Sequence, residues 1–311
     1  MKNKEKDIGD FIKKLIKKFL IPLYVWNLIY GILITILHHF GIKYGAGLSW
    51  RSLVLSPILD GHQFVFNLSS WFIVPLFIIQ FINIFMIKTI SKKDYYFYIH
   101  FVISLLIGFI GIEMAIRGYN QGLYLLVARI SYFIPFFSLG MLYKNNLEKY
   151  DKLSNVKYFI ILFSIDLLMI YSFGKLKAYT PSLANDYDVF YRPFLAGTLG
   201  IAFWLRISKI LVPILKDSKI VMTISNNTFA IMMHHLAGFF VLNSFCFLIN
   251  KYIIHLKEFN TEQFTQSIWY RYLPKHIENF NIIYAIFGIV FSLTIYKISK
   301  YVKSLPKRYL K

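Results

Sequence analysis

Eight long, continuously apolar stretches constrain this chain more than any other feature. Each holds about 20 residues, the length that an α-helix needs to cross the hydrocarbon core of a bilayer. Backbone groups in lipid must be hydrogen-bonded within their own segment, and the stretches lack the alternating polarity of barrel strands, so they predict helices. The predicted spans are Phe19–Phe40, Ser70–Ile87, Phe97–Ile116, Leu123–Tyr143, Val156–Phe173, Val189–Leu205, Thr228–Asn250 and Phe280–Ser299.

Composition agrees with a membrane protein. Hydrophobic residues make up 57% of the 311 positions and charged residues only 16%, against about 45–50% and 25% in soluble domains. This balance excludes a disordered chain, a coiled coil and an ordinary cytosolic enzyme. The single cysteine, Cys246, excludes a disulfide within the chain and a cysteine-based metal site. The predicted fold class is an all-α, polytopic transmembrane helix bundle of about eight spans.

The distribution of basic residues predicts the topology. The chain carries 35 Lys and Arg against 15 Asp and Glu, for a net charge of +20. Connections on one side of the predicted spans, with both termini, hold 24 of the basic residues, and the alternate connections hold nine. Cytoplasmic loops are rich in Lys and Arg, so both termini are expected in the cytoplasm. Topology thus accounts for the charge, and we expect no nucleic-acid partner.

The chain divides into three predicted parts: a basic cytoplasmic segment (1–18), a transmembrane domain (19–299) and a basic tail (300–311). We expect no cleavable signal peptide, because the first apolar run is too long. Between Asp10 and Pro22 the sequence predicts a basic amphipathic helix on the inner leaflet. Its Lys13, Lys14, Lys17 and Lys18 share one face. They would attract anionic lipid or, alternatively, the phosphates of a cytosolic donor.

Four ionisable residues lie within or near the ends of predicted spans, where charge is expensive and often functional. They are Glu113, Arg129, Asp166 and Arg192. Their signs predict the pairs Glu113–Arg129 and Asp166–Arg192. The pairs would either neutralise charge between helices or line a polar cavity that opens outward and suits a hydroxylated acceptor.

Two adjacent histidines, His234 and His235, follow the stretch SNNTFAIMM. If Ser225 caps the helix that begins there, the pair lies about two turns inside the membrane. Adjacent helical residues point about 100° apart, so at most one of the two faces a given cavity. A neutral imidazole there could be a general base or an interhelical hydrogen-bonding group. No metal-binding motif is present, and no metal is expected.

Three stretches together resemble the acyltransferase-3 family, the bacterial integral-membrane O-acyltransferases of surface polysaccharides. KKLIKKFLIPLYVWNLI (Lys13–Ile29) is similar to the family's basic, Pro-ended start of a span. FNLSSWFIVPLFIIQFI (Phe66–Ile82) is similar to its outer-loop element around Trp71, and ISNNTFAIMMHHL (Ile224–Leu236) to its histidine element. The segment FIPFFSLGMLY (Phe133–Tyr143) resembles a further span of the family. The likeness covers roughly residues 11–250.

The chain also departs from that family. The family usually opens with two further spans, the first of which carries an Arg and a His thought to be catalytic, and this sequence starts after them. The family's histidine before the Trp is replaced by Ser69 or Ser70. The basic segment uses Lys in place of Arg, which loses bidentate phosphate contact.

The resemblance implies acyl transfer from acyl-CoA, most simply acetyl-CoA, to a hydroxyl of a cell-surface polysaccharide, in a bacterial plasma membrane. Acyl-CoA is then a co-substrate, and no permanently bound cofactor is expected. The expected catalytic base is His234 or His235. The expected donor-binding residues are Lys17, Lys18, Arg206 and Lys209, and the expected acceptor-binding residues are Trp71, Arg192 and Asp188. Trp71 and the histidines are expected to line one water-filled passage.

Two other interpretations stay open. The intramembrane charges would equally serve a protein that exports a polysaccharide or lipid-linked glycan, although we find none of the repeated halves that are typical of coupled transporters. Alternatively, the chain is an N-terminally truncated, inactive homologue of the acyltransferases. A polysaccharide polymerase fits less well, because the outer loops are only moderately long.

Overall fold

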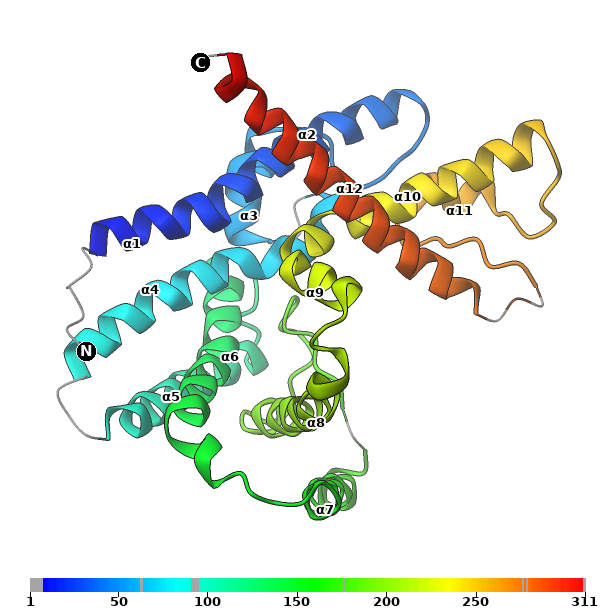
Figure 1. Cartoon of the computed structure of the whole chain (residues 1–311). Helices are drawn as coiled ribbons and strands as arrows, with labels where there is room; N and C mark the ends of the chain where they lie inside the picture. The colour runs from blue at the N-terminus through cyan, green and yellow to red at the C-terminus, as the bar shows by residue number, and fades with distance from the viewer. Residues whose placement is uncertain are drawn as a thin grey trace. The chain divides into compact units, whose positions relative to one another are not determined.

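A computed structural model of the chain describes residues 8–61, 64–90, 95–175, 177–275, 277 and 279–309. Within these ranges the regular secondary structure is helical, and no β-strand is present (Figure 1). The predicted all-α fold class is therefore confirmed for the described part of the chain. Residues 1–7 of the predicted basic segment and residues 310–311 of the predicted tail lie outside the described residues.

The eight predicted spans are all found as helices, and each is long and apolar enough to cross a membrane. The long helices are α2 (Ile21–His39), α4 (Ile73–Ile90), α5 (Tyr96–Ile116), α6 (Leu123–Leu142), α7 (Asn155–Phe173), α8 (Arg192–Leu215), α10 (Thr228–Tyr252) and α12 (Phe280–Tyr309). Short helical segments are α1 (Ile8–Leu15), η1 (Ile16–Leu20), η2 (Arg51–Leu55), α3 (Ser56–Leu59), η3 (Val65–Phe72), η4 (Tyr143–Leu147), η5 (Glu148–Tyr150), α9 (Lys219–Asn226) and α11 (Thr261–Gln266). Eight such helices among the described residues indicate a multi-pass membrane protein.

Some details of the helix ends differ from the sequence prediction. Helix α8 begins at Arg192 and continues to Leu215, well past the predicted end of the sixth span. Pro193 lies in its first turn, where the missing N–H of proline is not needed. Helix α10 begins at Thr228, and Ser225 lies inside α9. The prediction that Ser225 caps α10 is therefore wrong.

The chain forms two compact units, which we describe separately. Unit 1 comprises Met1–Leu20, Ile58–Asp60 and Phe72–Asp217, and unit 2 comprises Ile21–Pro57, Gly61–Trp71 and Ser218–Lys311. Unit 1 thus holds α1, η1 and α4 to α8, and unit 2 holds α2 and α9 to α12. The predicted domain boundaries at residues 18 and 299 stay predictions.

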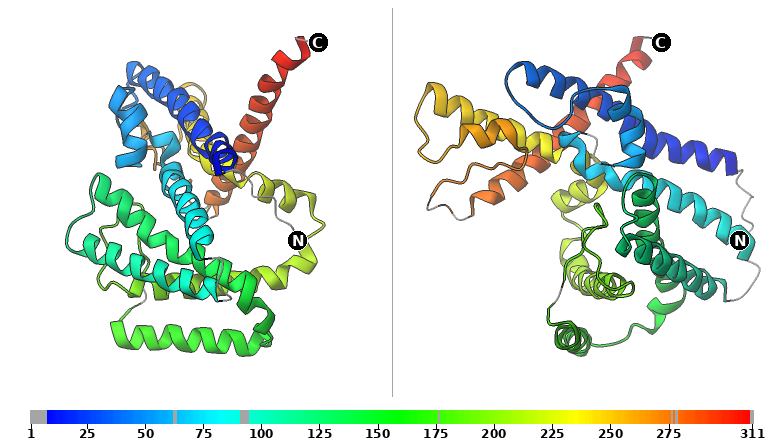
Figure 2. Two further views of the ribbon diagram at one scale, coloured as in Figure 1. Left: turned by 90° about the vertical axis from the view of Figure 1, so that its left-hand side faces the viewer. Right: turned by 180° about the vertical axis from the view of Figure 1, so that it is seen from behind.

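Within unit 1, α5 and α6 lie side by side in every view (Figures 1 and 2). Small residues allow their backbones to approach closely, which is a common way for helices to associate in membranes. Gly111 faces Ser131 so tightly that an added Cβ would lie 2.2 Å from the serine Cβ. Nearer the start of α5, Ser104 Oγ accepts a hydrogen bond of 2.6 Å from the Ser138 hydroxyl of α6. The adjoining core consists of Ile112, Ala115, Leu125, Ala128, Tyr132, Ala184, Tyr187 and Phe194.

Residues 8–20 of the predicted amphipathic segment are helical within unit 1, and their place on the inner leaflet stays a prediction. Leu15 and Phe19 are buried, and η1 packs against α4. The opposite face carries four exposed lysines, namely Lys13, Lys14, Lys17 and Lys18. Separation of lysine from apolar side chains at helical spacing is what an interfacial helix requires.

Within unit 2, α10 and α12 pack against each other (Figure 2), and two glycines lie at their contact. A Cβ added at Gly238 would lie 3.1 Å from the Cα of Gly288. Further along α10, the buried Asn243 donates to the Tyr270 carbonyl at 2.7 Å and thereby holds the loop that follows α11. Helix α2 contributes Tyr30 and Ile34 to an aromatic core that also contains Tyr44, Phe64, Phe66, Ala237 and Ile268.

The α5–α6 contact yields the first testable prediction. Replacing Gly111→Ala places a methyl group against Ser131 and should lower the free energy of unfolding by about 1–3 kcal/mol, because a tightly packed contact is overfilled. The matched control is Gly140→Ala in α6, where no atom lies within 4 Å of an added Cβ. Denaturant unfolding of both variants in detergent micelles measures the difference. Equal stability of the two would contradict the described packing.

Candidate functional site

His234 is held deep inside unit 2. Its side chain lies on α10 and is only 2% exposed. A hydrogen bond of 2.7 Å joins its Nδ1 to the hydroxyl of Tyr30 on α2. The ring of Trp26, also on α2, meets the imidazole edge-on at a centroid distance of 4.2 Å. These contacts position His234 as a buried connection between two helices.

His235 has different surroundings. Its side chain is half-buried, and Nδ1 lies 3.0 Å from the carbonyl oxygens of both Ile231 and Met232 in the same helix. A carbonyl oxygen can only accept, so Nδ1 carries the hydrogen. In the neutral ring the lone pair is therefore on Nε2. The Nε2 atom lies 3.5 Å from Ser69 Oγ, so the free lone pair faces a hydroxyl group.

Ser69 lies in η3, a 3₁₀ segment whose shape is supported by side-chain hydrogen bonds within unit 2. The next residue, Ser70, is buried and donates to the Asn67 carbonyl at 2.7 Å. The Asn67 side chain in turn donates to Asn27 Oδ1 on α2 at 2.9 Å. These bonds attach η3 to α2 and leave the half-buried Ser69 on the His235 side.

Sequence reasoning did not assign a role to Ser69. The sequence signal for Ser69 is its place immediately before the Ser70–Trp71 pair. Trp71 itself lies two residues further along η3 and is half-buried. The structure thus brings Ser69 and His235 together within unit 2.

Arg192 and Asp188, both expected to bind the acceptor, form an ion pair in unit 1 with a distance of 2.6 Å. Arg192 is buried, and it also donates to the Lys175 carbonyl at 2.6 Å. The Tyr179 hydroxyl donates to the same carboxylate at 2.8 Å. Partial burial works to raise the pKa of Asp188, but the bond from Tyr179 and the charge of Arg192 outweigh it and lower the pKa. Arg192 is therefore occupied in holding the loop before α8.

The predicted intramembrane ion pairs are wrong. Glu113 pairs with Arg117, one turn along its own helix, at 2.9 Å. The guanidinium group of Arg129 is fully buried and donates to the carbonyls of Ser182 and Asp60, the latter at 2.9 Å. Nearby acceptors on the same helix or in adjoining loops therefore replace the expected partners on other helices.

Asp166 is not joined to Arg192 either, because Arg192 is occupied by Asp188. Its half-buried side chain lines a cavity of about 460 Å³ in unit 1. The cavity lining is Leu162, Asp166, Lys177, Ala178, Ala196, Leu199, Gly200 and Phe203. The Lys177 ammonium lies 3.6 Å from Asp188, so it belongs to the loop network described above.

Arg206 and Lys209, which were expected to bind donor phosphates, are occupied by Asp151. Arg206 Nη2 contacts one carboxylate oxygen, and Lys209 Nζ lies 2.9 Å from the other. Arg206 also donates to the Leu153 carbonyl at 3.3 Å and stacks over the Tyr158 ring at 3.9 Å. This network attaches α8 to the segment before α7. Donor binding by Arg206 and Lys209 stays a prediction. The other two residues expected to bind the donor, Lys17 and Lys18, are exposed.

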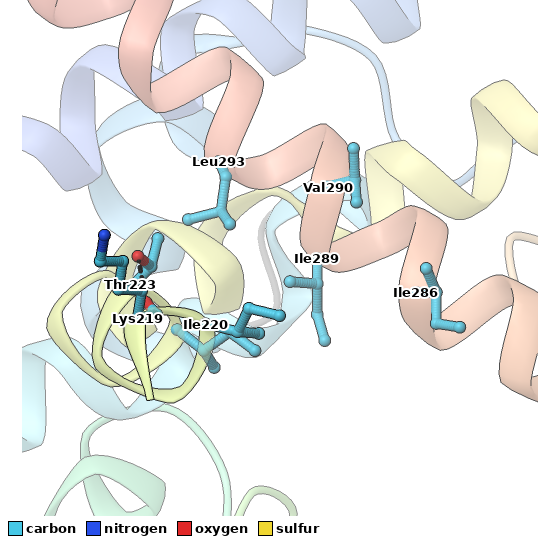
Figure 3. Close-up of a pocket in the computed structure, with 8 residues that line it drawn as sticks. Lys219, Ile220, Thr223, Ile286, Ile289, Val290 and Leu293 are labelled. Carbon is cyan, nitrogen blue, oxygen red and sulfur yellow. Dashed lines mark hydrogen bonds between the residues drawn. The ribbon is translucent and has the colours of Figure 1, made fainter. Parts of the chain in front are cut away.

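A groove of about 420 Å³ lies between α9 and α12 in unit 2 (Figure 3). It is lined by Lys219, Ile220, Thr223, Ile224, Ile286, Ile289, Val290 and Leu293. The opposite face of α12, with Gly288 and Ser292, packs toward α10, and a Cβ at Gly288 would lie 3.4 Å from the His235 Cβ. The groove therefore does not open toward His235.

A third cavity, of about 630 Å³, lies in unit 1 beside Glu113 and Arg117. His234, His235 and Trp71 line none of these three cavities. The expected passage through Trp71 and the histidines is not among them. In the described ranges no group of three or more His, Cys, Asp or Glu residues is arranged to hold a metal ion.

No protein-family model matches the chain, and no curated protein or solved structure matches it significantly.

The Asp151 network gives a stability prediction. In Asp151→Asn the buried Arg206 loses its counter-charge, so the free energy of unfolding should fall by about 3 kcal/mol. The matched control is Glu148→Gln, which removes an exposed ion pair with Lys144 and should leave stability nearly unchanged, because water and salt screen such a pair. Denaturant unfolding in micelles measures both variants. A similar small effect in the two would contradict the buried network.

The same carboxylate predicts a pH effect. Burial works to raise the pKa of Asp151, but the hydrogen bonds from Lys209 and Tyr143 and the charge of Arg206 outweigh it and lower the pKa. A carboxylate with a lowered folded-state pKa stabilises fully above its unfolded value, near pH 4, and loses this contribution as the pH falls through the folded-state pKa. Acidification below about pH 4 should therefore destabilise the native protein more than Asp151→Asn. Parallel loss of stability in both would exclude Asp151 as the cause.

Proposed function

We propose that this protein is a membrane-bound O-acyltransferase, which transfers an acyl group, most simply acetyl, from acyl-CoA to a hydroxyl of a cell-surface or extracellular polysaccharide. The resemblance of residues 11–250 to the acyltransferase-3 family supports the proposal. So does the set of eight apolar helices, because that family acts within the membrane.

The observation that carries the proposal is the state of His235. Its Nδ1 hydrogen is occupied by two backbone carbonyls, so Nε2 presents a lone pair to a hydroxyl group at 3.5 Å. An imidazole held in one tautomer, with its basic nitrogen facing an O–H, has the arrangement that a general base needs. His234 is occupied by Tyr30, and we therefore assign the base to His235 and a supporting role to His234.

The chemistry requires removal of a proton from an attacking hydroxyl as its oxygen bonds to the thioester carbonyl carbon. His235 Nε2 would accept that proton and return it to the departing sulfur of coenzyme A. For the donor, the exposed Lys17 and Lys18 are the proposed phosphate contacts. For the acceptor we keep Trp71, whose half-buried indole could stack on a sugar face, and not the internally paired Arg192 and Asp188.

Esterification of surface glycans tests the function. In cells that carry the gene, His235→Ala should lower acyl-ester content by about 100-fold or more, because general-base catalysis typically contributes that much. The matched control is His39→Ala, which removes an exposed histidine at the end of α2. Released acetate, measured per unit of purified glycan, gives the readout.

The outcomes separate the competing functions. Unchanged ester content on deletion of the gene, together with lost surface glycan, would favour an export protein. Unchanged ester content with normal glycan would favour an inactive homologue. Full activity in His235→Ala would remove this histidine from the mechanism.

We also propose that both termini face the cytoplasm of a bacterial cell, since basic residues are concentrated in those connections. After the buried Cys246 is replaced by Ser, two exposed lysines offer a matched pair of reporters, Lys257→Cys and Lys149→Cys. A membrane-impermeant maleimide should label position 257 in intact cells and position 149 only after lysis. The reverse pattern would invert the topology.

A further inference from the structure

We propose that Ser69 is a nucleophile that carries the acyl group as a covalent ester between donor and acceptor. This inference rests on the proposed acyltransferase function and goes beyond it. With His235 as general base, the acyl group could pass directly from donor to acceptor, and no enzyme-bound ester would be needed.

An activated serine needs three groups in contact: the nucleophile, a base, and a group that orients the base. All three are present within unit 2. The nucleophile is the Ser69 hydroxyl, and the base is His235 Nε2, 3.5 Å away. The orienting groups are the carbonyls of Ile231 and Met232, which accept the Nδ1 hydrogen at 3.0 Å. Contacts of this kind are often looser before substrate binds, and then tighten.

The neighbouring serine lacks these properties. Ser70 is buried, and its hydroxyl donates to the Asn67 carbonyl. Ser69 is half-buried, and within the described residues its hydroxyl has one hydrogen-bond partner, His235. Since η3 is held to α2 through Asn67 and Asn27, Ser69 is presented by a supported backbone.

The first half-reaction balances as follows. His235 Nε2 takes the Ser69 proton as Oγ forms a bond to the thioester carbonyl carbon. The C–S bond breaks, its electron pair leaves with sulfur, and His235 returns the proton to that sulfur. Coenzyme A departs as the free thiol, and Ser69 holds the acyl group as an ester.

In the second half-reaction the acceptor takes the place of the donor. His235 Nε2 takes the proton of the acceptor hydroxyl, whose oxygen attacks the ester carbonyl. The bond to Ser69 Oγ breaks, and His235 returns the proton to that oxygen. The acceptor leaves as an ester and the serine is restored. Because the donor leaves before the acceptor reacts, the two substrates need not be bound together.

A fluorophosphonate probe tests the nucleophile without any donor or acceptor. The purified full-length protein in detergent should be labelled at Ser69, as identified by peptide mass spectrometry. Labelling should fall by about 100-fold or more in Ser69→Ala and in His235→Ala, because an unactivated hydroxyl reacts slowly. The matched control Ser244→Ala removes another half-buried serine of unit 2, which donates to the Phe240 carbonyl, and should label normally.

Radiolabelled acetyl-CoA without acceptor then tests the acyl step. The wild-type protein should retain label on Ser69, and added acceptor glycan should release it. Ser69→Cys should hold the label as a thioester that neutral hydroxylamine removes, a signature that a merely structural role would not produce. Unfolding curves for Ser69→Ala identify any loss that is due to misfolding.

The outcomes distinguish the two proposals. Normal transfer by Ser69→Ala, without label on the wild-type serine, would overturn the covalent carrier and keep the acyltransferase function. A wild-type protein that reacts with the fluorophosphonate probe but transfers no acyl group from any acyl-CoA would overturn both. Label at another residue would also overturn the assignment of Ser69.

Discussion

A polar group inside a bilayer has no water to bind, and the rest of the structure depends on how that demand is met. The backbone meets it by forming helices. Buried cationic side chains of this protein find their partners over short distances: Arg192 pairs with Asp188 one turn away, Arg206 with Asp151 near the start of α7, and Arg129 donates to loop carbonyls. Carbonyl oxygens at the ends of helices and in loops are abundant acceptors. They satisfy a buried guanidinium without requiring a carboxylate at the same depth on another helix.

The same demand explains the difference between two adjacent histidines. His234 lies on the face of α10 that packs against α2, and its Nδ1 forms a hydrogen bond with the Tyr30 hydroxyl. The next residue points elsewhere and satisfies its Nδ1 within its own helix, with the carbonyls of Ile231 and Met232. In the neutral imidazole this arrangement places the lone pair on Nε2, which lies 3.5 Å from Ser69 Oγ. A packing requirement thus produces a chemically useful tautomer.

The fold and the candidate site were predictable from the sequence to different degrees, because spans depend on local spacing and hydrogen-bond partners depend on the folded structure. The eight spans and the amphipathic segment depend only on the spacing of apolar and basic residues along the chain, and both were predictable. The partners of Glu113 and Arg129 depend on which acceptor lies nearest in space, and sign alone predicted them wrongly. Ser69 was missed because a lone serine carries no pattern until the fold brings it to His235.

The proposed carrier gives the departure from the acyltransferase-3 pattern a chemical meaning. Where that family has a histidine before the Trp, this chain has Ser69 and Ser70, and losing an imidazole would ordinarily remove a base. Here an imidazole is available from α10, and the hydroxyl occupies the position next to it. Compared with the pattern that this chain resembles, the proposed arrangement has a nucleophile in place of a base, and one histidine serves both half-reactions. Such an exchange is chemically consistent only if the remaining base is held in a single tautomer, and the two carbonyls on Nδ1 meet that condition.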